Sequence, residues 1–276
     1  SLFATKRAVS ILVQEQDSLY VHGDTLMITG KVDERITRAF RNAKFFKTDL
    51  SGKCDSIHSE EKTGITQLIT KPILWNGENQ MTGDSIHLIS NKETEKLDSL
   101  KVLNNAFIIS LDSISMEGYN QAKGKDLFGK FIENELKIID LIKNTEVIYY
   151  MYNDDDELIG INKTICSKIR ITMENNDVDE LTFYTNPDGD MFPEKDLPEN
   201  SRILKGFVWY GDERILSKDD IFDEDDNNIK LAVIKGLDNP IDIDAEEKER
   251  NNNETDPINN SKATDPKQLK KLKKVK

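Results

Sequence analysis

The sequence has few of the residues on which many catalytic and metal sites depend. Only 2 cysteines and 3 histidines occur among its 276 residues. Cys54 and Cys166 lie far apart in the sequence, so one disulfide or two buried thiols explain them better than a catalytic nucleophile does. His22, His58 and His87 each lie within a few residues of an Asp, and these recurring positions predict solvated surface side chains rather than metal ligands.

Long apolar runs and catalytic motifs are also missing. No stretch reaches the roughly 18 apolar residues of a transmembrane helix. Neither a Gly-x-Ser-x-Gly elbow, nor a phosphate-binding glycine loop, nor a His-Glu-x-x-His pair occurs. Carboxylates are plentiful, but their places in turn signals already account for most of them. The sequence therefore predicts a non-enzymatic protein with no catalytic residue, no metal site and no cofactor.

The composition is poor in apolar residues and rich in acids. Hydrophobic residues make up 37% of the chain and charged residues 32%. This balance favours an elongated fold, with more surface per residue, over an ordinary mixed α/β core. The formal net charge of −13 argues against a nucleic-acid partner, because binding to nucleic acid needs a basic field that displaces counterions.

The composition divides the chain into three predicted regions. Residues 1–185 form a β-rich domain, and residues 186–237 form an extension that contains prolines, a candidate last strand at 206–210 and a short helix capped near Ser217. Residues 238–276 hold nine acids, nine bases and no aromatic residue, which predicts a disordered charged tail. Its basic end, PKQLKKLKKVK, fits either a frayed soluble terminus or a weak contact with an anionic membrane surface.

Short β-rich segments separated by polar signals fill residues 1–210. An Asp carboxylate can accept a hydrogen bond from a backbone N–H two residues on, so we expect each signal to start a turn. The residues that follow alternate between polar and apolar, as in SIHL at 85–88 and SISM at 113–116, which puts one apolar face inward. Asp24-Thr25 is a near copy of the Asp-Ser pair that marks these signals. The pair itself occurs at Asp17, Asp55, Asp84, Asp98 and Asp112.

Longer blocks repeat as well, which is typical of a repeat architecture. GDTL at 23–26 matches GDSI at 83–86, and RNAKF at 41–45 matches NNAF at 104–107. One such unit cannot bury its apolar face alone, so the repeats predict a stack of short strands that share one apolar seam.

Other stretches carry weaker signals. Residues 133–144 and 32–43 fit a helix and a strand equally well by pattern. Residues 147–151, VIYYM, predict a strand because they are β-branched and aromatic. Pro187-Asp188-Gly189 predicts a tight turn, and Pro193 and Pro198 exclude regular strand pairing nearby.

A basic stretch lies within the acidic chain at residues 31–53. An ordinary solvated face explains it, and so does contact with the phosphates of an amphiphile whose tails enter the apolar seam. Its basic residues are Lys31, Arg35, Arg38, Arg41, Lys44, Lys47 and Lys53.

The order and spacing of these segments resemble the OstA-like family, the LptA-type periplasmic proteins of lipopolysaccharide transport, and in particular the version found in Bacteroidota. The stretches that carry the resemblance are AKFFKTDLSGKCDSI (43–57), KPILWNGENQMTGDSIHL (71–88), AFIISLDSISMEGYNQAKGKDLFGKF (106–131), IYYMYNDDDELIGINKTICSKI (148–169) and NPDGDMFPEKDLPENSRILKGFVW (186–209). The region after Asn186 departs from the minimal pattern of that family, which suggests a segment that docks another component.

The resemblance implies an open antiparallel β-jellyroll, or β-taco, in which two sheets meet and hold the acyl chains of lipopolysaccharide. It implies a periplasmic location, and lipid A together with inner- and outer-membrane components of the transport machinery as partners. It also implies head-to-tail self-association through edge strands. Because the chain begins with Ser1 rather than Met, we expect further repeats of the strand stack to precede it in the natural protein.

Candidate lipid contacts are the apolar residues of the best-defined strands, assigned by alternation. Packing between the two sheets accounts for them as well as lipid contact does. A structural β-repeat scaffold of the cell envelope is the alternative function. The candidates are Phe45, Ile57, Trp75, Ile86, Leu88, Ile108, Ile114, Met116, Phe128 and Phe131.

Overall fold

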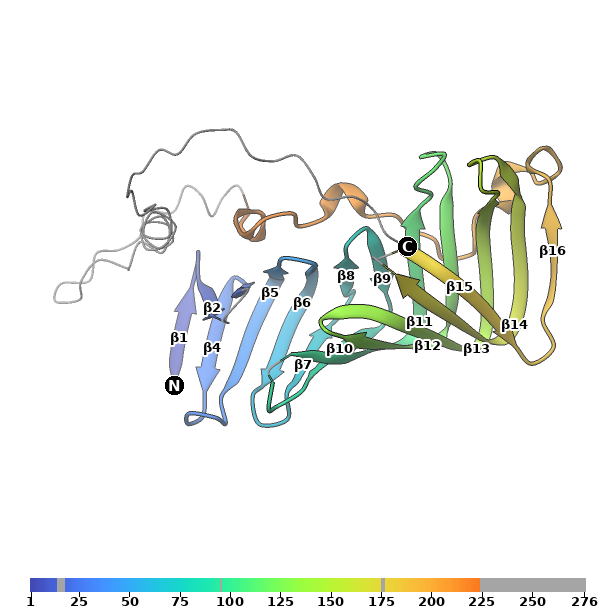
Figure 1. The fold of residues 1–276 in the computed structure, drawn as a ribbon. Helices are drawn as coiled ribbons and strands as arrows, with labels where there is room; N and C mark the ends of the chain where they lie inside the picture. Colours follow the sequence, from blue (N-terminus) through green and yellow to red (C-terminus); the bar gives the residue numbers. More distant parts are fainter. Residues whose placement is uncertain (14–17, 95, 175–176, 224–276) are drawn as a thin grey trace, which may run out of the picture. The chain divides into compact units, whose positions relative to one another are not determined.

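A computed structural model describes residues 1–13, 18–94, 96–174 and 177–223 of the chain. Within these ranges the regular elements are antiparallel β-strands and short 3₁₀ turns, with no α-helix, and this confirms the predicted all-β class (Figure 1). The described residues fall in one compact unit, Ser1–Ile229. The predicted disordered tail at 238–276, and Asp17 of the Asp-Ser repeat, lie outside the described residues.

Groups of short strands alternate along the chain with groups of long strands. The short strands are β1 (Leu2–Thr5), β2 (Val9–Val13), β3 (Ser18–His22), β4 (Thr25–Thr29), β7 (Ile65–Ile69), β8 (Ile73–Asn76), β9 (Asn79–Thr82), β10 (Ser85–Ser90), β15 (Asp177–Tyr184) and β16 (Asp188–Phe192). The long strands are β5 (Ile36–Lys47), β6 (Leu50–Glu60), β11 (Leu97–Leu111), β12 (Tyr119–Ile132), β13 (Glu135–Tyr152) and β14 (Leu158–Glu174).

All these strands pair into a single 16-stranded sheet, which is folded so that two walls face each other. Each long strand passes from one wall to the other. The bare wall consists of β1, β4, β7, β10 and β15 with residues 36–40, 56–60, 97–103, 126–132, 135–142 and 168–174 of the long strands. The covered wall consists of β2, β3, β8, β9 and β16 with residues 43–47, 50–54, 106–111, 119–123, 145–152 and 158–166.

Pairs of residues with positive φ form the corner between the walls. Arg41 and Asn42 in β5 have φ of 58° and 49°, and Asn104 and Asn105 in β11 have 54° and 53°. The strand register shifts at both pairs, because the extra residue bulges out of the ladder and bends the strand. Asn tolerates this left-handed conformation better than most residues. The repeated Arg-Asn-Ala and Asn-Asn-Ala blocks are therefore corner signals.

The Gly-Asp repeat also lies at the corner rather than in hairpin turns. Asp24 and Asp84 each accept a side-chain hydrogen bond from the Asn of the neighbouring pair, Asn42 at 3.3 Å and Asn105 at 2.9 Å. A Cβ on Gly83 would lie 2.4 Å from Val102, so the chain passes too close to the next strand for any larger residue. The prediction of turns here is wrong, because the Asp side chains accept hydrogen bonds from a neighbouring strand at the corner.

Other members of the Asp-Ser repeat take different places. Asp55 lies inside β6 and Asp98 inside β11, so neither starts a turn. Asp112 does start the turn between β11 and β12, as predicted. Residues 113–116, however, belong to that turn and form no strand, so the alternation predicted for them is wrong. The Asp-Ser pair thus occurs within strands, at the corner and in a turn, so it does not mark one kind of backbone conformation.

The ambiguous stretches prove to be strands. Residues 36–43 lie in β5, and residues 135–144 begin β13, which also contains the predicted strand at 147–151. The predicted turn at 187–189 is wrong, because Asp188–Phe192 forms β16 and pairs with β14. Thr185 and Asn186, with φ of 62° and 50°, make the connection instead.

After β16 the chain turns back along the outer face of the covered wall as residues 193–223, here called the strap, drawn in orange in Figure 1. It follows one row of side chains that runs across the strands, from β14 through β12 to β9. Its regular elements are the 3₁₀ turns Glu194–Asp196, Glu199–Ser201, Gly211–Glu213 and Lys218–Ile221.

The sequence predictions for the strap are partly right. Residues 206–210 form no strand, and instead Phe207 and Trp209 pack on the ring of Tyr119 at 5.1 and 5.3 Å between centroids. Ser217 does cap a short helical turn, with a capping box to Asp220, although the turn is a 3₁₀ turn. The strap therefore docks on the sheet of its own chain.

Two glutamine side chains of the covered wall hold the strap by its backbone. Gln121 donates a hydrogen bond to the Arg202 carbonyl at 2.7 Å and accepts one from the Leu204 N–H at 2.9 Å. Gln80 does the same for the backbone of residues 208–210, at 2.8 and 2.7 Å. Both side chains are buried, so their amides replace water as partners of the strap.

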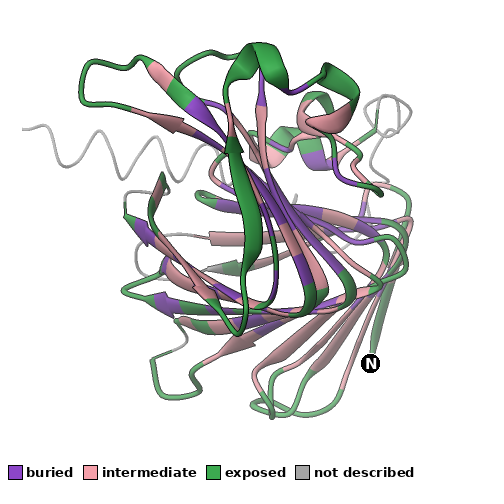
Figure 2. Ribbon diagram, turned by 90° about the vertical axis from the view of Figure 1, so that its right-hand side faces the viewer, coloured by how far each residue is buried: buried purple, intermediate pink, exposed green. Residues whose placement is uncertain are grey.

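Apolar contacts and ion pairs complete the strap interface. A second hydrophobic cluster forms there from Phe107, Ile109, Ile148, Tyr150, Ile161, Leu197 and Leu204. Further along, Lys53 pairs with Glu213 and Lys44 with Asp223, the latter at 2.6 Å. The middle of the covered wall is consequently buried on both faces, as in β8, where all four residues are buried. Figure 2 shows the buried residues of the molecule in purple.

Candidate functional site

The space between the walls holds the main hydrophobic core of the described chain. Alternation along each strand sends every second side chain into it. On the bare wall, Ile86 and Leu88 of β10 lie inside, while His87 between them lies outside. On the covered wall, Phe45 and Ile108 lie inside. The predicted apolar seam is therefore present and is continuous from strand to strand.

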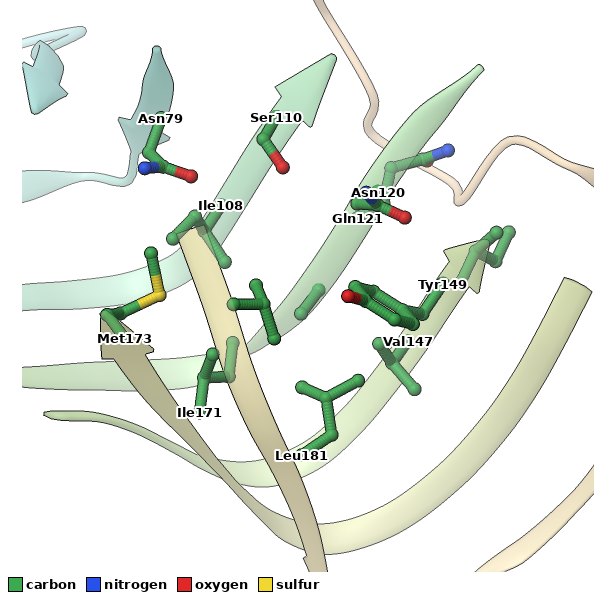
Figure 3. Close-up of a pocket in the computed structure, with 13 residues that line it drawn as sticks. Asn79, Ile108, Ser110, Asn120, Gln121, Val147, Tyr149, Ile171, Met173 and Leu181 are labelled. Carbon is green, nitrogen blue, oxygen red and sulfur yellow. The ribbon is translucent and has the colours of Figure 1, made fainter. Parts of the chain in front are cut away.

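A pocket opens in this interior where β9, β11, β12 and β13 of the covered wall face β14 and β15 of the bare wall. Its empty volume is about 330 Å³, part of which is open solvent. Figure 3 shows Asn79, Ser110 and Asn120 on one side and apolar side chains on the other. The lining residues are Asn79, Ile108, Ser110, Asn120, Gln121, Ala122, Val147, Ile148, Tyr149, Ile171, Met173, Val178 and Leu181.

The covered-wall side of the pocket is layered. Ile108, Ala122 and Val147 are register partners across β11, β12 and β13 and form an apolar row. Ser110 and Asn120 are also register partners, two residues further from the corner, and Tyr149 lies two residues beyond Val147 in the same direction. Because residues two apart in a strand share a face, this second row, here called the polar row, lies beside the apolar one.

No charged side chain lines the pocket within the part of the chain that the structure describes. Burial raises the pKa of the Tyr149 hydroxyl, and the nearby carboxylates of Asp112 and Asp177 raise it further. Asp112 is itself buried and accepts hydrogen bonds from Ser115 and from the Tyr152 hydroxyl. The electrostatic character of this end of the groove is therefore neutral to acidic.

The structure brings together six of the ten candidate lipid-contact residues. These six lie in the core between the walls, and whether they touch lipid stays a prediction. They are Phe45, Ile57, Ile86, Leu88, Ile108 and Phe131.

The other four candidates lie elsewhere. Trp75 is buried on the outer face of the covered wall, where it lines a second pocket with Ile215 of the strap. Ile114 and Met116 lie in the turn after β11 and are 43% and 63% exposed. Phe128 is opposite Lys101 and Asp140 on the outer face of the bare wall.

Sequence reasoning named only Ile108 of the 13 residues that line the pocket, and it named none from the bare wall. Ile171, Met173 and Leu181 line it, yet none was among the candidates. The signal was present, because Ile169, Ile171 and Met173 alternate along β14 with polar residues between them. The polar row was not predicted, because Ser110 and Asn120 at inward positions interrupt the apolar alternation that marks an inward face.

The basic stretch at 31–53 does not form one patch. Lys44 and Lys53 face the strap and pair with its acids. Arg35 pairs with Glu61 on the bare wall at 3.3 Å. Contact of this stretch with phosphates stays a prediction. Arg35, Lys44 and Lys53 already form ion pairs with acids of the same chain.

The histidines and cysteines correct one expectation and settle another. His22 is buried, donates from Nδ1 to the Ala8 carbonyl at 2.7 Å and packs edge-on against Phe222, so the predicted surface position is wrong for it. Cys54 and Cys166 are buried free thiols, and burial raises the pKa of Cys54 to about 12. No group of three or more His, Cys, Asp or Glu in the described ranges is placed to hold a metal ion.

The structure's helical segments, as far as they are described, include none long and apolar enough to cross a membrane. No family model matches the chain, and no curated protein matches it. A similar solved structure is that of LptH from Pseudomonas aeruginosa, described as the LptA homologous periplasmic component of the conserved lipopolysaccharide transport device. The similarity covers 53% of this chain and 99% of LptH, at 15% sequence identity and a TM-score of 0.38. A TM-score this low adds nothing to what the strands of the chain show by themselves.

Proposed function

We propose that this protein is a non-enzymatic carrier of lipopolysaccharide that holds acyl chains between its two walls. The observation that carries the proposal is the apolar interior shared by both walls. At one end of this interior lies the pocket, which is lined by the apolar row and the polar row. The apolar lining suits an aliphatic chain, and the polar row suits a hydrogen-bonding group attached to it. The choice of lipopolysaccharide, and of a periplasmic location, rests on the sequence resemblance to the OstA-like family in its Bacteroidota version.

The proposal includes head-to-tail assembly into a bridge between inner- and outer-membrane components of the transport machinery. Strands β1 and β2 end the two walls on one side, and β15 and β16 end them on the other. The edge formed by β1 and β2 exposes large apolar residues, with Leu2 at 55%, Phe3 at 69% and Leu12 at 49% exposure. An exposed edge of this kind invites pairing with another strand.

Lipid analysis tests this function against the alternative of a structural envelope scaffold. The protein is extracted gently from its native envelope, and its bound lipids are identified by mass spectrometry. We expect lipopolysaccharide at close to one molecule per chain. Protein that carries associated envelope proteins but no lipid would contradict the carrier and support the scaffold.

A further inference from the structure

The polar row of the pocket carries an inference about which lipids the groove accepts. Ser110, Asn120 and Tyr149 lie beside the apolar row formed by Ile108 and its register partners, on the side away from the corner. An acyl chain that lies across the apolar row and extends along the strands, away from the corner, would bring its first polar group against these three side chains. The arrangement separates chain from head group within one pocket.

The polar row has hydrogen-bonding capacity left over. The Asn120 side chain uses its Oδ1 to accept from the Tyr150 N–H at 2.9 Å, which leaves its amide donors for other partners. Within the described ranges, the hydroxyls of Ser110 and Tyr149 make no hydrogen bond to another residue. Tyr149 is half-buried, so a partner for its hydroxyl must come from the pocket side or from solvent.

The charges around the polar row disfavour an anion. The pocket lining contains no Lys or Arg. The charged groups that act on Tyr149 are the carboxylates of Asp112 and Asp177. A phosphate placed here would lose water without gaining a cation and would lie near two like charges, whereas a hydroxyl, ester or amide would meet donors and acceptors.

We propose that this end of the groove selects acyl chains whose first polar group is uncharged, and that Ser110, Asn120 and Tyr149 recognise that group. The inference rests on the proposed function, because it presumes that acyl chains enter between the walls. It adds that charged head groups stay outside this pocket.

Two lipids that differ only in a phosphate test the selectivity: 1-myristoylglycerol and 1-myristoylglycerol 3-phosphate. Binding of each to the full-length protein is measured by equilibrium dialysis below its critical micelle concentration. We expect the uncharged lipid to bind about tenfold more tightly, a difference comparable to a small number of hydrogen bonds. Equal binding, or tighter binding of the phosphate lipid, would overturn the inference and leave the carrier function standing. Binding of neither lipid would overturn both.

Two variants test the assigned residues. Tyr149→Phe removes the hydroxyl alone, and we expect it to weaken binding of 1-myristoylglycerol roughly 2- to 10-fold. The matched control is Tyr184→Phe on the outer face of the bare wall, which should change nothing. Ser110→Lys should reverse the preference by supplying a cation, with folding checked by circular dichroism. An unchanged affinity in Tyr149→Phe, or an unchanged preference in a folded Ser110→Lys protein, would contradict the role of the polar row.

Discussion

The two walls share their strands but differ in what covers their outer faces. In β8 of the covered wall all four residues, Ile73–Asn76, are buried, whereas β10 of the bare wall alternates, with Ile86 and Leu88 inside and His87 outside. The difference comes from the strap, which lies on one outer face. A strand reads as continuously apolar when both its faces are buried, and as alternating when one face meets water.

This contrast assigns different roles to the walls. The strap ties several strands of the covered wall together by backbone hydrogen bonds and ion pairs. The bare wall has no comparable belt among the described residues, and its outer face carries polar side chains and some exposed apolar ones. If the groove widens to admit lipid, the bare wall is therefore the one expected to move about the corner.

The largest effect should follow from removing an apolar anchor of the strap. Leu204→Ala removes a side chain that is 3% exposed and should cost about 2–4 kcal/mol in free energy of unfolding. The matched change on the bare wall, Ile69→Ala, removes a side chain that is 41% exposed and should cost about 1 kcal/mol or less. Urea unfolding midpoints compare the two. Equal costs would show that the strap is not part of the folded core.

A smaller effect should follow from cutting the glutamine clamps. The pair Gln80→Ala and Gln121→Ala leaves backbone groups of the strap without partners and should cost about 1–3 kcal/mol. Trypsin should then cleave at Arg202 and Lys205 faster than in the unchanged protein. Gln67→Ala, on the outer face of the bare wall, is the control and should leave the rate of cleavage unchanged. A strap that stays equally protected in the double variant would contradict the clamp.

The smallest effect concerns the outer face of the bare wall. Arg170 donates two hydrogen bonds to Asp140, at 2.8 and 2.7 Å, and these lower the pKa of Asp140 below its ordinary 3.8. Because the folded pKa is lowered, the stabilisation is present above about pH 4 and is lost as the pH falls through the folded value. Asp140→Asn should therefore cost under about 1 kcal/mol at pH 7, and the difference should shrink as the pH falls below about 4. A constant difference across this range in urea titrations would contradict the ion pair.

The sequence was sufficient for the fold class and for the ladder, but not for the corner. Period-two alternation placed Ile86 and Leu88 correctly inside. The Gly-Asp pairs at Asp24 and Asp84 looked like turns because their local chemistry is the same in a turn and at a bulged fold line. At the corner, an Asn from the neighbouring strand donates a hydrogen bond to the Asp. This contact can be recognised only when the pairing of the strands is known.

The site was predicted in part, and its failures have physical causes. Phe128 and Phe131 were both assigned to the interior, yet residues three apart in a strand lie on opposite faces. Trp75 was assigned there because nothing in its own segment shows that the strap, more than a hundred residues later, buries the other face. A face covered by a distant segment cannot be read from local periodicity.

Photo-crosslinking on β15 tests the central claim most directly. A benzophenone amino acid is placed at Leu181, which lines the pocket, or at the adjacent Thr182, which faces outward. The protein is then irradiated with purified lipopolysaccharide. The carrier model predicts a lipopolysaccharide adduct at Leu181 and little or none at Thr182. Equal labelling at the two positions, or labelling at Thr182 alone, would contradict a lipid held between the walls.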